Sequence, residues 1–531
     1  MSTIEQATVT LPIRNLDGLS TQAYSTLPTC NYWTGGLMNC RSISSGWMHF
    51  VTAAGVVMLT GGAGIAQTTS TADNWPRFRG SNDGVIADNP GLPETWSRTE
   101  NVIWNIEVPG QGWSSPIVWD DLIFVTSVLS DEVRQGPGQD VIPEPSQEGL
   151  GLPVTSIDGV ASRPPLATPY TWMLYAIDFE TGQIRWEREL RRGLPINPKH
   201  PKNTYASETP VTDGKHIYVF HGNAGLFAVD FDGQLIWSRE VTIPDGPSDA
   251  VTEARIAPGG PPIDYFVGIG QAASPALHEN QIFVAADHET RTWFFAAFST
   301  QTGEELWHVL QPKSEEAYGW STPFVWEHDQ RTEVVILGNN LVHSYDLDGQ
   351  LLWSLKGLSV STTPTPFSAN GLLYVSSGYP SERFRPVYAI RPGASGDISL
   401  GPDETSNSHV VWFQRSAGTY MPSGLVYDDL FYGLYTQGFL TTHDAKTGEE
   451  VYGRVRIARG TGGFTSSPWA YNGKVFAMSE DGDTYVIAAG PEYKLLGQNS
   501  LGEMVNATPA IIRGNLLIRT VSSLWRIGKI D

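Results

Sequence analysis

The sequence predicts an all-β protein, and more narrowly an eight-bladed β-propeller built from four-stranded antiparallel blades. Three observations predict this fold: a composition rich in strand and turn formers, a motif that recurs eight times, and a strand near the first repeat that can complete the last one. The chain has 531 residues, of which 17% are charged and 11% aromatic, with 55 Gly and 36 Pro. Such a composition favours short strands and tight turns over helices.

The first half of the motif is a Ser/Thr-Pro pair, a turn and an apolar strand. Six copies keep an apolar or aromatic residue eight positions after the proline, and two variant copies have a longer turn or a glycine in place of the proline. The anchor positions are Pro116, Pro210, Pro275, Pro323, Pro366, Gly424, Pro468 and Pro509. Apart from insertions, their spacing is close to the ~40 to 50 residues of a propeller blade.

The second half of the motif is an apolar strand, an acidic turn that ends in glycine, and a strand that carries an aromatic residue. That residue is Trp186, Trp237, Trp307, Trp353, Trp412 or Tyr452 in successive copies. The two halves give four strands per repeat. An isolated four-stranded sheet leaves both faces and edges exposed, so we expect the blades to stack radially, with the tryptophans as wedges between them.

The ends of the repeat region predict how the ring closes. The segment 101–108 (NVIWNIEV) carries Trp104 in the outer-strand pattern, whereas no such tryptophan strand follows the last copy of the first half. We therefore expect 101–108 to complete the eighth blade. The propeller then spans 101–531, after a lead-in segment at 67–100, and Pro/Gly-rich insertions at 129–169 and 239–270 interrupt it.

Residues 1–66 are expected to precede the folded protein. The stretch 49–64 is small and apolar, and Ala63-Gly64-Ile65-Ala66 fits a signal-peptidase site. Translation from Met38 or Met48 would place this signal at the N-terminus. The alternative is a tail with a membrane-like stretch. The signal predicts a soluble, exported protein of the periplasm or cell envelope.

The two cysteines, Cys30 and Cys40, both precede the predicted cleavage site. The mature chain would therefore have no disulfide, thiolate metal site or thiol nucleophile. The formal charge of −22 disfavours nucleic acid as a partner. No apolar run is long enough to form a membrane helix.

The common catalytic and metal-binding motifs do not occur in the chain. The acidic turns that begin at Asp230, Asp346 and Glu480 lack the spacing of a calcium loop, so we interpret them as hairpin turns. His343 and His443 occupy similar positions in two different blades and are interpreted as strand histidines rather than a metal pair. The sequence therefore predicts no catalytic and no metal-binding residue.

An aromatic residue precedes several anchors by three to five positions, where the chain crosses into the inner strand of a blade. These crossings are expected to open on one face, beside the central channel. The predicted ligand or partner face consists of Trp113, Asn203, Tyr205, Glu208, Trp320, Arg385, Tyr420 and Phe464. Such a mix suits the stacking of a flat ligand or of a partner's side chains. The alternative is that the rings only fill gaps between blades.

The repeat resembles that of the PQQ-like (quinoprotein-type) propeller family. This family includes quinoprotein dehydrogenases and the propeller lipoprotein of the outer-membrane β-barrel assembly machine. The segments NWPRFRGSNDGV, HPKNTYASETPVTDG and FTSSPWAYNGKVFAMSEDGDTYV are similar to an exported bacterial group of PQQ-binding-like propeller repeat proteins. Such a blade motif is specific for the fold and weak for function.

The resemblance leaves the function open. A quinoprotein alcohol dehydrogenase would need a disulfide of neighbouring cysteines, a calcium site and a catalytic aspartate, and no segment of this chain matches them. The cofactor is therefore unknown, and PQQ is disfavoured. The main expectation is a non-catalytic binding or assembly scaffold of the cell envelope, whose partner is an envelope protein or a small flat ligand. The alternatives are a PQQ- or other cofactor-dependent oxidoreductase and a carbohydrate-binding propeller.

Overall fold

The computed structural model describes residues 74–130, 169–195, 199, 202–241, 271–288, 292–312, 318–338, 340–380 and 382–530. They belong to one compact unit, Gln67–Asp531. The predicted signal within 1–66 and most of the insertions 129–169 and 239–270 lie outside the described residues. The regular structure of the described part consists of β-strands without a helix, so this part contains no helix that could cross a membrane.

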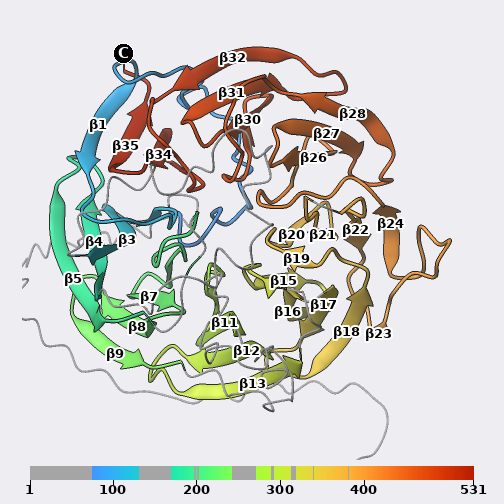
Figure 1. Ribbon diagram of the computed structural model, residues 1–531, viewed down its shortest axis with the longest axis horizontal. Coiled ribbons are helices and arrows are strands. Elements are labelled where there is room, and N and C mark those ends of the chain that lie inside the picture. The colour runs from blue at the N-terminus through green and yellow to red at the C-terminus, as the bar shows by residue number, and fades with distance from the viewer. Residues whose placement is uncertain are drawn as a thin grey trace, which may run out of the picture. The chain divides into compact units, whose positions relative to one another are not determined.

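Eight antiparallel four-stranded sheets form a ring, which confirms the predicted eight-bladed propeller (Figure 1). Blade 1 is β2 (Ile117–Trp119), β3 (Leu122–Ser130), β4 (Tyr170–Asp178) and β5 (Ile184–Gly193); blade 2 is β6 (Val211–Thr212), β7 (His216–His221), β8 (Gly225–Asp230) and β9 (Leu235–Arg239). Blade 3 is β10 (Ala276–His278), β11 (Gln281–His288), β12 (Thr292–Ser299) and β13 (Glu305–Pro312); blade 4 is β15 (Phe324–His328), β16 (Arg331–Gly338), β17 (Leu341–Tyr345) and β18 (Leu351–Lys356).

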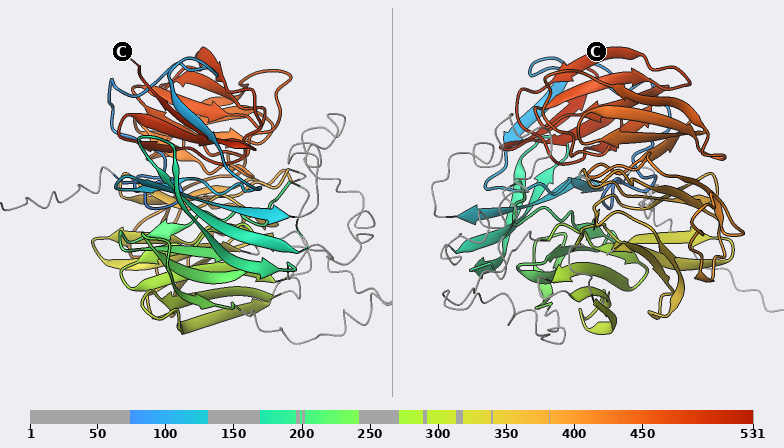
Figure 2. Two further views of the ribbon diagram at one scale, coloured as in Figure 1. Left: turned by 90° about the vertical axis from the view of Figure 1, so that its left-hand side faces the viewer. Right: turned by 45° about the vertical axis from the view of Figure 1, so that its right-hand side comes forward.

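The second half of the ring repeats this order, and Figure 2 shows the blades from two other sides. Blade 5 is β20 (Phe367–Ala369), β21 (Leu372–Ser376), β22 (Val387–Ile390) and β24 (Val410–Gln414); blade 6 is β25 (Leu425–Tyr427), β26 (Leu430–Tyr435), β27 (Phe439–Asp444) and β28 (Glu450–Arg456). Blade 7 is β29 (Trp469–Tyr471), β30 (Lys474–Met478), β31 (Asp483–Ala488) and β32 (Leu495–Ser500); blade 8 is β33 (Ala510–Ile512), β34 (Asn515–Arg519), β35 (Ser523–Gly528) and β1 (Val102–Glu107).

Three short strands lie outside this pattern: β14 (Tyr318–Gly319), β19 (Ser361–Thr362) and β23 (Gly396–Asp397). β14 pairs in parallel with β19, and β23 adds a fifth, parallel strand to blade 4. The segment expected to form an outer strand at 101–108 is observed as β1. It pairs antiparallel with β35, with Asn105 opposite Trp525.

The eight-residue register of the motif is that of a two-residue hairpin. In blade 7, for example, Trp469 directly follows the anchor proline and pairs with Phe476, and the turn between them is Asn472-Gly473. Both turn residues have positive φ, 51° and 67°, which is the geometry of the type I′ turns that suit twisted hairpins.

The outer-strand tryptophan of one blade fits against the acidic turn of the next. A Cβ on Gly233 would lie 2.8 Å from the Trp186 ring, and Trp186 Nε1 donates a hydrogen bond to Phe231 O at 2.8 Å. Glycine is required here because the indole occupies the side-chain position. The same arrangement occurs at Trp104 with Gly182, Trp237 with Gly303, Trp307 with Gly349 and Trp412 with Gly448. The predicted role of the tryptophans as wedges is confirmed at these five positions.

The aspartate of the acidic turn holds the turn in shape. Asp178 accepts hydrogen bonds from the Thr181 amide and hydroxyl, both at 2.7 Å, and from Arg185 Nε at 3.0 Å. The hydrogen bond to Arg185 and those to Thr181 lower the pKa of Asp178 to about 2. Asp230 and Asp346 accept amide hydrogen bonds in the same way, so their segments are hairpin turns as predicted.

Trp353 departs from the pattern. Its Nε1 donates to Glu333 Oε2 within its own blade, at 2.8 Å, and it lies opposite Gly396 of β23. Glu333 is fully buried and also accepts hydrogen bonds from Arg331 Nη2 at 3.2 Å and from Ser344 Oγ; its Oε1 lies 2.8 Å from His328 Nε2. Blade 4 therefore replaces the usual contact of the wedge with a buried polar network.

The lead-in segment crosses one end of the central channel. Trp75 exchanges backbone hydrogen bonds with Val118 of blade 1, and Arg79 Nη2 donates to Gly424 O, beside blade 6, at 2.8 Å. Further along, Ile86 donates its amide to Ala470 of blade 7. Because blades 1 and 6 lie on different sides of the ring, residues 75–86 span the channel, at the end toward which the inner strands run.

Candidate functional site

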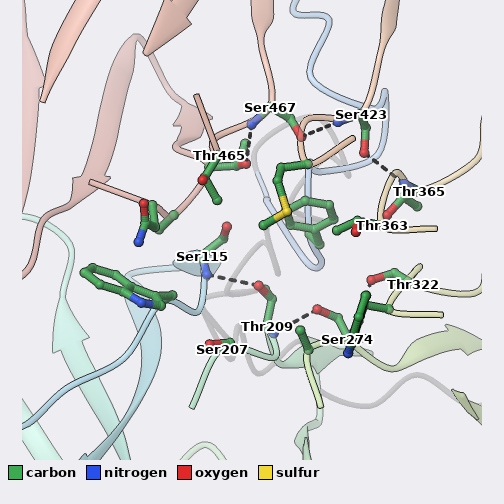
Figure 3. A pocket seen from close by; sticks show the side chains of 18 of the residues that line it. Ser115, Ser207, Thr209, Ser274, Thr322, Thr363, Thr365, Ser423, Thr465 and Ser467 are labelled. Carbon is green, nitrogen blue, oxygen red and sulfur yellow. Dashed lines mark hydrogen bonds between the residues drawn. The ribbon is translucent and has the colours of Figure 1, made fainter. Parts of the chain in front are cut away.

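A cavity of about 220 Å³ lies in the central channel, on the side where the chain enters each inner strand. We call this side the entry face. The residue directly before each anchor position is a serine or threonine, and all eight of these residues line the cavity. Figure 3 labels all of them except Thr508. This hydroxyl ring consists of Ser115, Thr209, Ser274, Thr322, Thr365, Ser423, Ser467 and Thr508.

Hydrogen bonds from blade to blade hold the hydroxyl ring together. The Ser115 amide donates to Thr209 Oγ1 at 3.0 Å, and the Thr209 amide donates to Ser274 Oγ at 2.9 Å. Four further links repeat this bond: Ser274 to Thr322, Thr365 to Ser423, Ser423 to Ser467 and Ser467 to Thr508. A residue before proline favours extended backbone, which helps to give the ring members the same orientation.

The hydroxyl ring retains hydrogen-bonding capacity after these links are made. Six of its hydroxyls accept one amide hydrogen bond, whereas those of Ser115 and Thr365 accept none from the described residues. Within the described part of the chain, no ring hydroxyl donates its own proton to a protein group. Asn506 also lines the cavity, is 7% exposed, and has no hydrogen-bond partner for its buried Oδ1 in the described structure. Buried polar groups of this kind normally bind water or a ligand.

Apolar side chains bound the cavity around the hydroxyl ring. Trp113, Trp320, Tyr420 and Met421 line it from the entry crossings. Phe78 belongs to the lead-in segment that crosses the far end of the channel. The cavity therefore combines a polar belt with aromatic and apolar surfaces.

One ion pair lies at the rim of the cavity. Lys202, which lines the cavity, places Nζ 2.6 Å from Glu480 Oε1, and Glu480 also accepts a hydrogen bond from Thr465 Oγ1 at 2.7 Å. The side chains of Lys202 and Glu480 are 17% and 10% exposed. Lys202 is the only cationic side chain among the described lining residues, and Glu480 neutralises it.

The structure brings four of the eight predicted site residues to the cavity. Trp113, Asn203, Trp320 and Tyr420 line it. Asn203 is held by its Nδ2 donating to Gln271 O and by its Oδ1 accepting from the Thr204 amide, each at 2.9 Å. That these residues bind a ligand stays a prediction.

The two other predicted aromatic residues do not line the cavity. Tyr205 packs against Tyr170, with ring centroids 4.9 Å apart, and Phe464 is fully buried beside Tyr485, at 6.0 Å. Both rings fill the space between strands, which is the alternative considered for this set. Tyr420 and Phe464 both precede their anchors by four positions, so the path of the crossing decides whether such a ring lines the cavity or enters the core.

The predicted Glu208 and Arg385 are also not among the described residues that line the cavity. Glu208 is buried, with Oε2 2.9 Å from His221 Nδ1, so it is part of a polar contact inside blade 2. Arg385 donates to Pro380 O at 2.8 Å and to Glu382 O at 3.1 Å, and thereby braces its own loop. Burial lowers the pKa of Arg385.

The predicted strand histidines lie on separate blades, His343 in β17 and His443 in β27. Burial lowers the pKa of both, to about 4 for His343. Across the described residues, no group of three or more His, Cys, Asp or Glu side chains is placed to hold a metal ion.

The sequence prediction missed the hydroxyl ring, Asn506, and the pair of Lys202 and Glu480. The residues of the hydroxyl ring belong to the Ser/Thr-Pro motif, so the sequence contains a pattern that indicates them, although this pattern predicts only the fold. Lys202 and Glu480 are 278 positions apart, and no local pattern could pair them.

The lining does not fit PQQ, the cofactor after which this type of blade is named. PQQ is a tricyclic quinone with three carboxylates, and it needs cationic partners when it is buried. Lys202 is the one cation of the described lining, and it is already paired. We therefore derive no step that involves this cofactor.

Comparisons with known structures give three matches of low sequence identity, of which one has a TM-score above 0.5 and supports the fold. The quinohemoprotein alcohol dehydrogenase from Comamonas testosteroni matches with a TM-score of 0.54 at 10% sequence identity, over 87% of this chain and 82% of that chain. BamB from Moraxella catarrhalis matches with a TM-score of 0.45 at 12% identity, over 66% and 91% of the two chains. The computationally designed Ika8 protein gives 0.42 at 12% identity, over 68% and 93%. At these identities the likeness to the dehydrogenase concerns the fold alone.

No curated protein matches this chain in sequence. The family model described as outer membrane protein assembly factor BamB matches residues 172–454 and 295–522. The two matches together cover more than half of the chain and most of the ring. The chain therefore belongs to this family of PQQ-like propellers related to BamB.

Proposed function

We propose that the protein is a non-catalytic binding scaffold of the cell envelope that recognises its ligand or partner on the entry face. The observation that carries this proposal is the central cavity, whose hydroxyl ring and Asn506 retain hydrogen-bonding groups that the fold itself does not use. The description of the family as an outer membrane assembly factor supports a place in the envelope. The predicted signal sequence supports the same location.

The chemistry of the lining favours binding over catalysis. General acid–base catalysis needs a titratable group beside the substrate, and a hydroxyl nucleophile needs an adjacent base. Among the described lining residues the hydroxyls have no such base, and the nearby Glu480 is held by Lys202 and Thr465. The entry face can therefore recognise a ligand with the groups it has, whereas a reaction would need a group brought by a cofactor.

Site-specific photocrosslinking in the native envelope tests the location of binding. A photoreactive amino acid would replace Met421 at the cavity, and, as a matched control, Leu495 on the exposed outer strand β32. We expect a defined crosslinked species from the Met421 position and none from the Leu495 position. Crosslinking from Leu495 alone would place the binding surface on the perimeter and overturn the proposal.

Thermal denaturation tests the alternative of a cofactor-dependent oxidoreductase. PQQ with Ca²⁺ should leave the melting temperature of the purified protein unchanged, because the one cation of the described lining, Lys202, is already paired with Glu480. A rise in melting temperature, or a quinone absorbance in the purified protein, would favour the oxidoreductase instead.

A further inference from the structure

We infer that the cavity binds a neutral, hydroxyl-rich ring, the chemistry of a single monosaccharide unit. This inference rests on the proposed function, because it names the ligand class of the same cavity. It follows from four properties of the lining: its balance of donors and acceptors, its charge, its size and its aromatic surfaces.

The lining offers donors and acceptors together. Each hydroxyl of the ring has a proton to donate, and the six oxygens that accept an amide hydrogen bond each keep one lone pair free. Asn506, which also lines the cavity, adds a side-chain amide to this polar belt. An anion would use only the donors of the hydroxyl groups, and a cation would use only their lone pairs. A ligand with several hydroxyl groups can satisfy both kinds of group.

The charge at the rim excludes a simple anion site. Lys202 is engaged at 2.6 Å by Glu480, which is itself largely buried. Because the two charges neutralise each other, neither an anionic nor a cationic ligand finds an unpaired opposite charge in the described lining. A neutral ligand enters without breaking the ion pair, so it avoids the cost of leaving either charge buried and unpaired.

The size of the cavity suits a small ligand. Its 220 Å³ lies below the ~300 to 1,000 Å³ typical of sites for drug-sized molecules. A single sugar ring is a ligand of this small class, and a longer oligosaccharide would insert one terminal unit and extend out of the cavity.

Aromatic rings supply the apolar contacts that a sugar needs. A pyranose has polar edges and a face of C–H groups, which packs well on an indole or phenol ring. Trp113, Trp320 and Tyr420 line the entry side of the cavity, and Phe78 lies toward the closed end. The hydroxyl ring lies where the edges of a bound sugar would be. The aromatic side chains would thus contact the faces of the bound sugar, and the hydroxyl groups of the cavity would bind its edges.

Titration calorimetry and tryptophan fluorescence on the full chain test the inference. The probes are glucose, galactose, mannose and N-acetylglucosamine, with glucuronate as the charged counterpart and sorbitol as the open-chain one. We expect at least one neutral sugar to bind, and both glucuronate and sorbitol to bind at least ten times more weakly. Tighter binding of glucuronate, or equal binding of sorbitol, would overturn the inferred ligand class.

Two ring positions allow a matched mutational test. The hydroxyls of Ser115 and Thr365 accept no amide within the described structure, so S115A and T365V remove cavity-facing donors without breaking a link of the hydroxyl ring. We expect each to weaken sugar binding by about 5- to 30-fold at an unchanged melting temperature. The control S368A removes an exposed hydroxyl in the middle of β20 that does not line the cavity, and it should leave binding unchanged. Unchanged affinity in the double variant S115A/T365V would place the sugar elsewhere and overturn the inference.

The two proposals fail separately. If no sugar binds while crosslinking from Met421 persists, the sugar inference is wrong and the binding scaffold stands. If crosslinking occurs only from the perimeter, the proposed function fails, whatever the calorimetry shows.

Discussion

Lys202 and Glu480 form an ion pair of 2.6 Å at the rim of the central cavity, although 278 positions separate them in the chain. Lys202 lies in the crossing from blade 1 to blade 2, and Glu480 lies in the turn between β30 and β31 of blade 7. The pair therefore ties together two parts of the ring that share no blade. It also sets the electrostatic character of the cavity, because Lys202 is the one charged side chain among the described lining residues and Glu480 neutralises it.

Breaking this pair should destabilise the protein. K202M leaves the carboxylate of Glu480 buried with only Thr465 as a described side-chain partner, and we expect a loss of about 3 kcal/mol in the free energy of unfolding. The double variant K202M/E480Q should lose less than the two single variants combined, by about 1 to 3 kcal/mol. Urea denaturation measures all three. Additive losses would show that the two groups do not interact.

The exposed pair of Lys356 and Asp397 serves as the control. Its side chains are 68% and 52% exposed, with Nζ and Oδ2 3.5 Å apart. Because water screens such a pair, K356M should change the free energy of unfolding by less than about 1 kcal/mol.

A methyl group on the turn glycine should disrupt the contact between blades 1 and 2. Gly233 has φ of 82°, and a Cβ there would meet the Trp186 ring at 2.8 Å. Gly473 also has positive φ, 67°, but a Cβ there would meet nothing within 4 Å. G473A therefore measures the conformational cost alone, about 1 to 2 kcal/mol. We expect G233A to cost a further 1 to 3 kcal/mol, roughly, in urea denaturation, owing to the displaced indole. Equal losses would contradict the wedge contact.

Removing the buried carboxylate of Glu333 in blade 4 should lower the free energy of unfolding substantially. E333L leaves Trp353 Nε1 and Arg331 without their buried partner, and we expect a loss of about 3 to 5 kcal/mol. E333Q keeps one acceptor oxygen and the side-chain shape, so its loss should be smaller. A smaller loss in E333L than in E333Q, measured by thermal or urea denaturation, would contradict the role of the carboxylate as the centre of the network.

Acidification should destabilise the fold through His343. Burial lowers its pKa from 6.5 to about 4, so below pH 6.5 the unfolded chain binds a proton that the folded chain does not. The contribution of neutral His343 is thus present at pH 7 and is lost as the pH falls toward 4. It amounts to at most about 3 kcal/mol, since one pKa unit corresponds to about 1.4 kcal/mol.

Urea midpoints between pH 7 and pH 4.5 test this contribution in the native chain and in H343Q. The variant should lose less stability on acidification. His443, whose pKa burial also lowers, remains in both proteins and provides a common background. Parallel pH profiles for the two proteins would show that His343 is protonated equally in the folded and unfolded states.

The fold was predictable from the sequence because each blade repeats the same local chemistry. The Ser/Thr-Pro entry, the two-residue hairpin and the Asp-Gly or Thr-Gly turn each determine a local geometry, and eight copies of them leave few arrangements other than a ring. The fifth strand β23 and the network of Glu333 were not predictable, since β23 comes from the segment between β22 and β24 and the network lies within blade 4, and the repeated motif encodes neither.

The candidate site was predictable only in part. Trp113 and Trp320 were found because they stand at a fixed distance before the anchor, and both line the cavity. Tyr205 and Phe464 stand at similar positions and turn into the core, because the path of each crossing decides where its ring points. Phe78 and Lys202 reach the cavity through contacts between distant segments, which a local pattern does not encode.

The lead-in segment, which crosses the far end of the channel, can take its final place only late in folding. Arg79 meets Gly424 across a sequence separation of 345, Tyr471 meets Pro93 across 378, and Trp96 meets Asn499 across 403. These early residues have no complete docking surface until blades 6 and 7 have been synthesised, and contacts of such long range form slowly. Phe78 should therefore reach its place among the last steps of folding. A chain that stops folding before that step would lack Phe78 in the lining of the cavity. Ligand binding would therefore indicate that folding is complete.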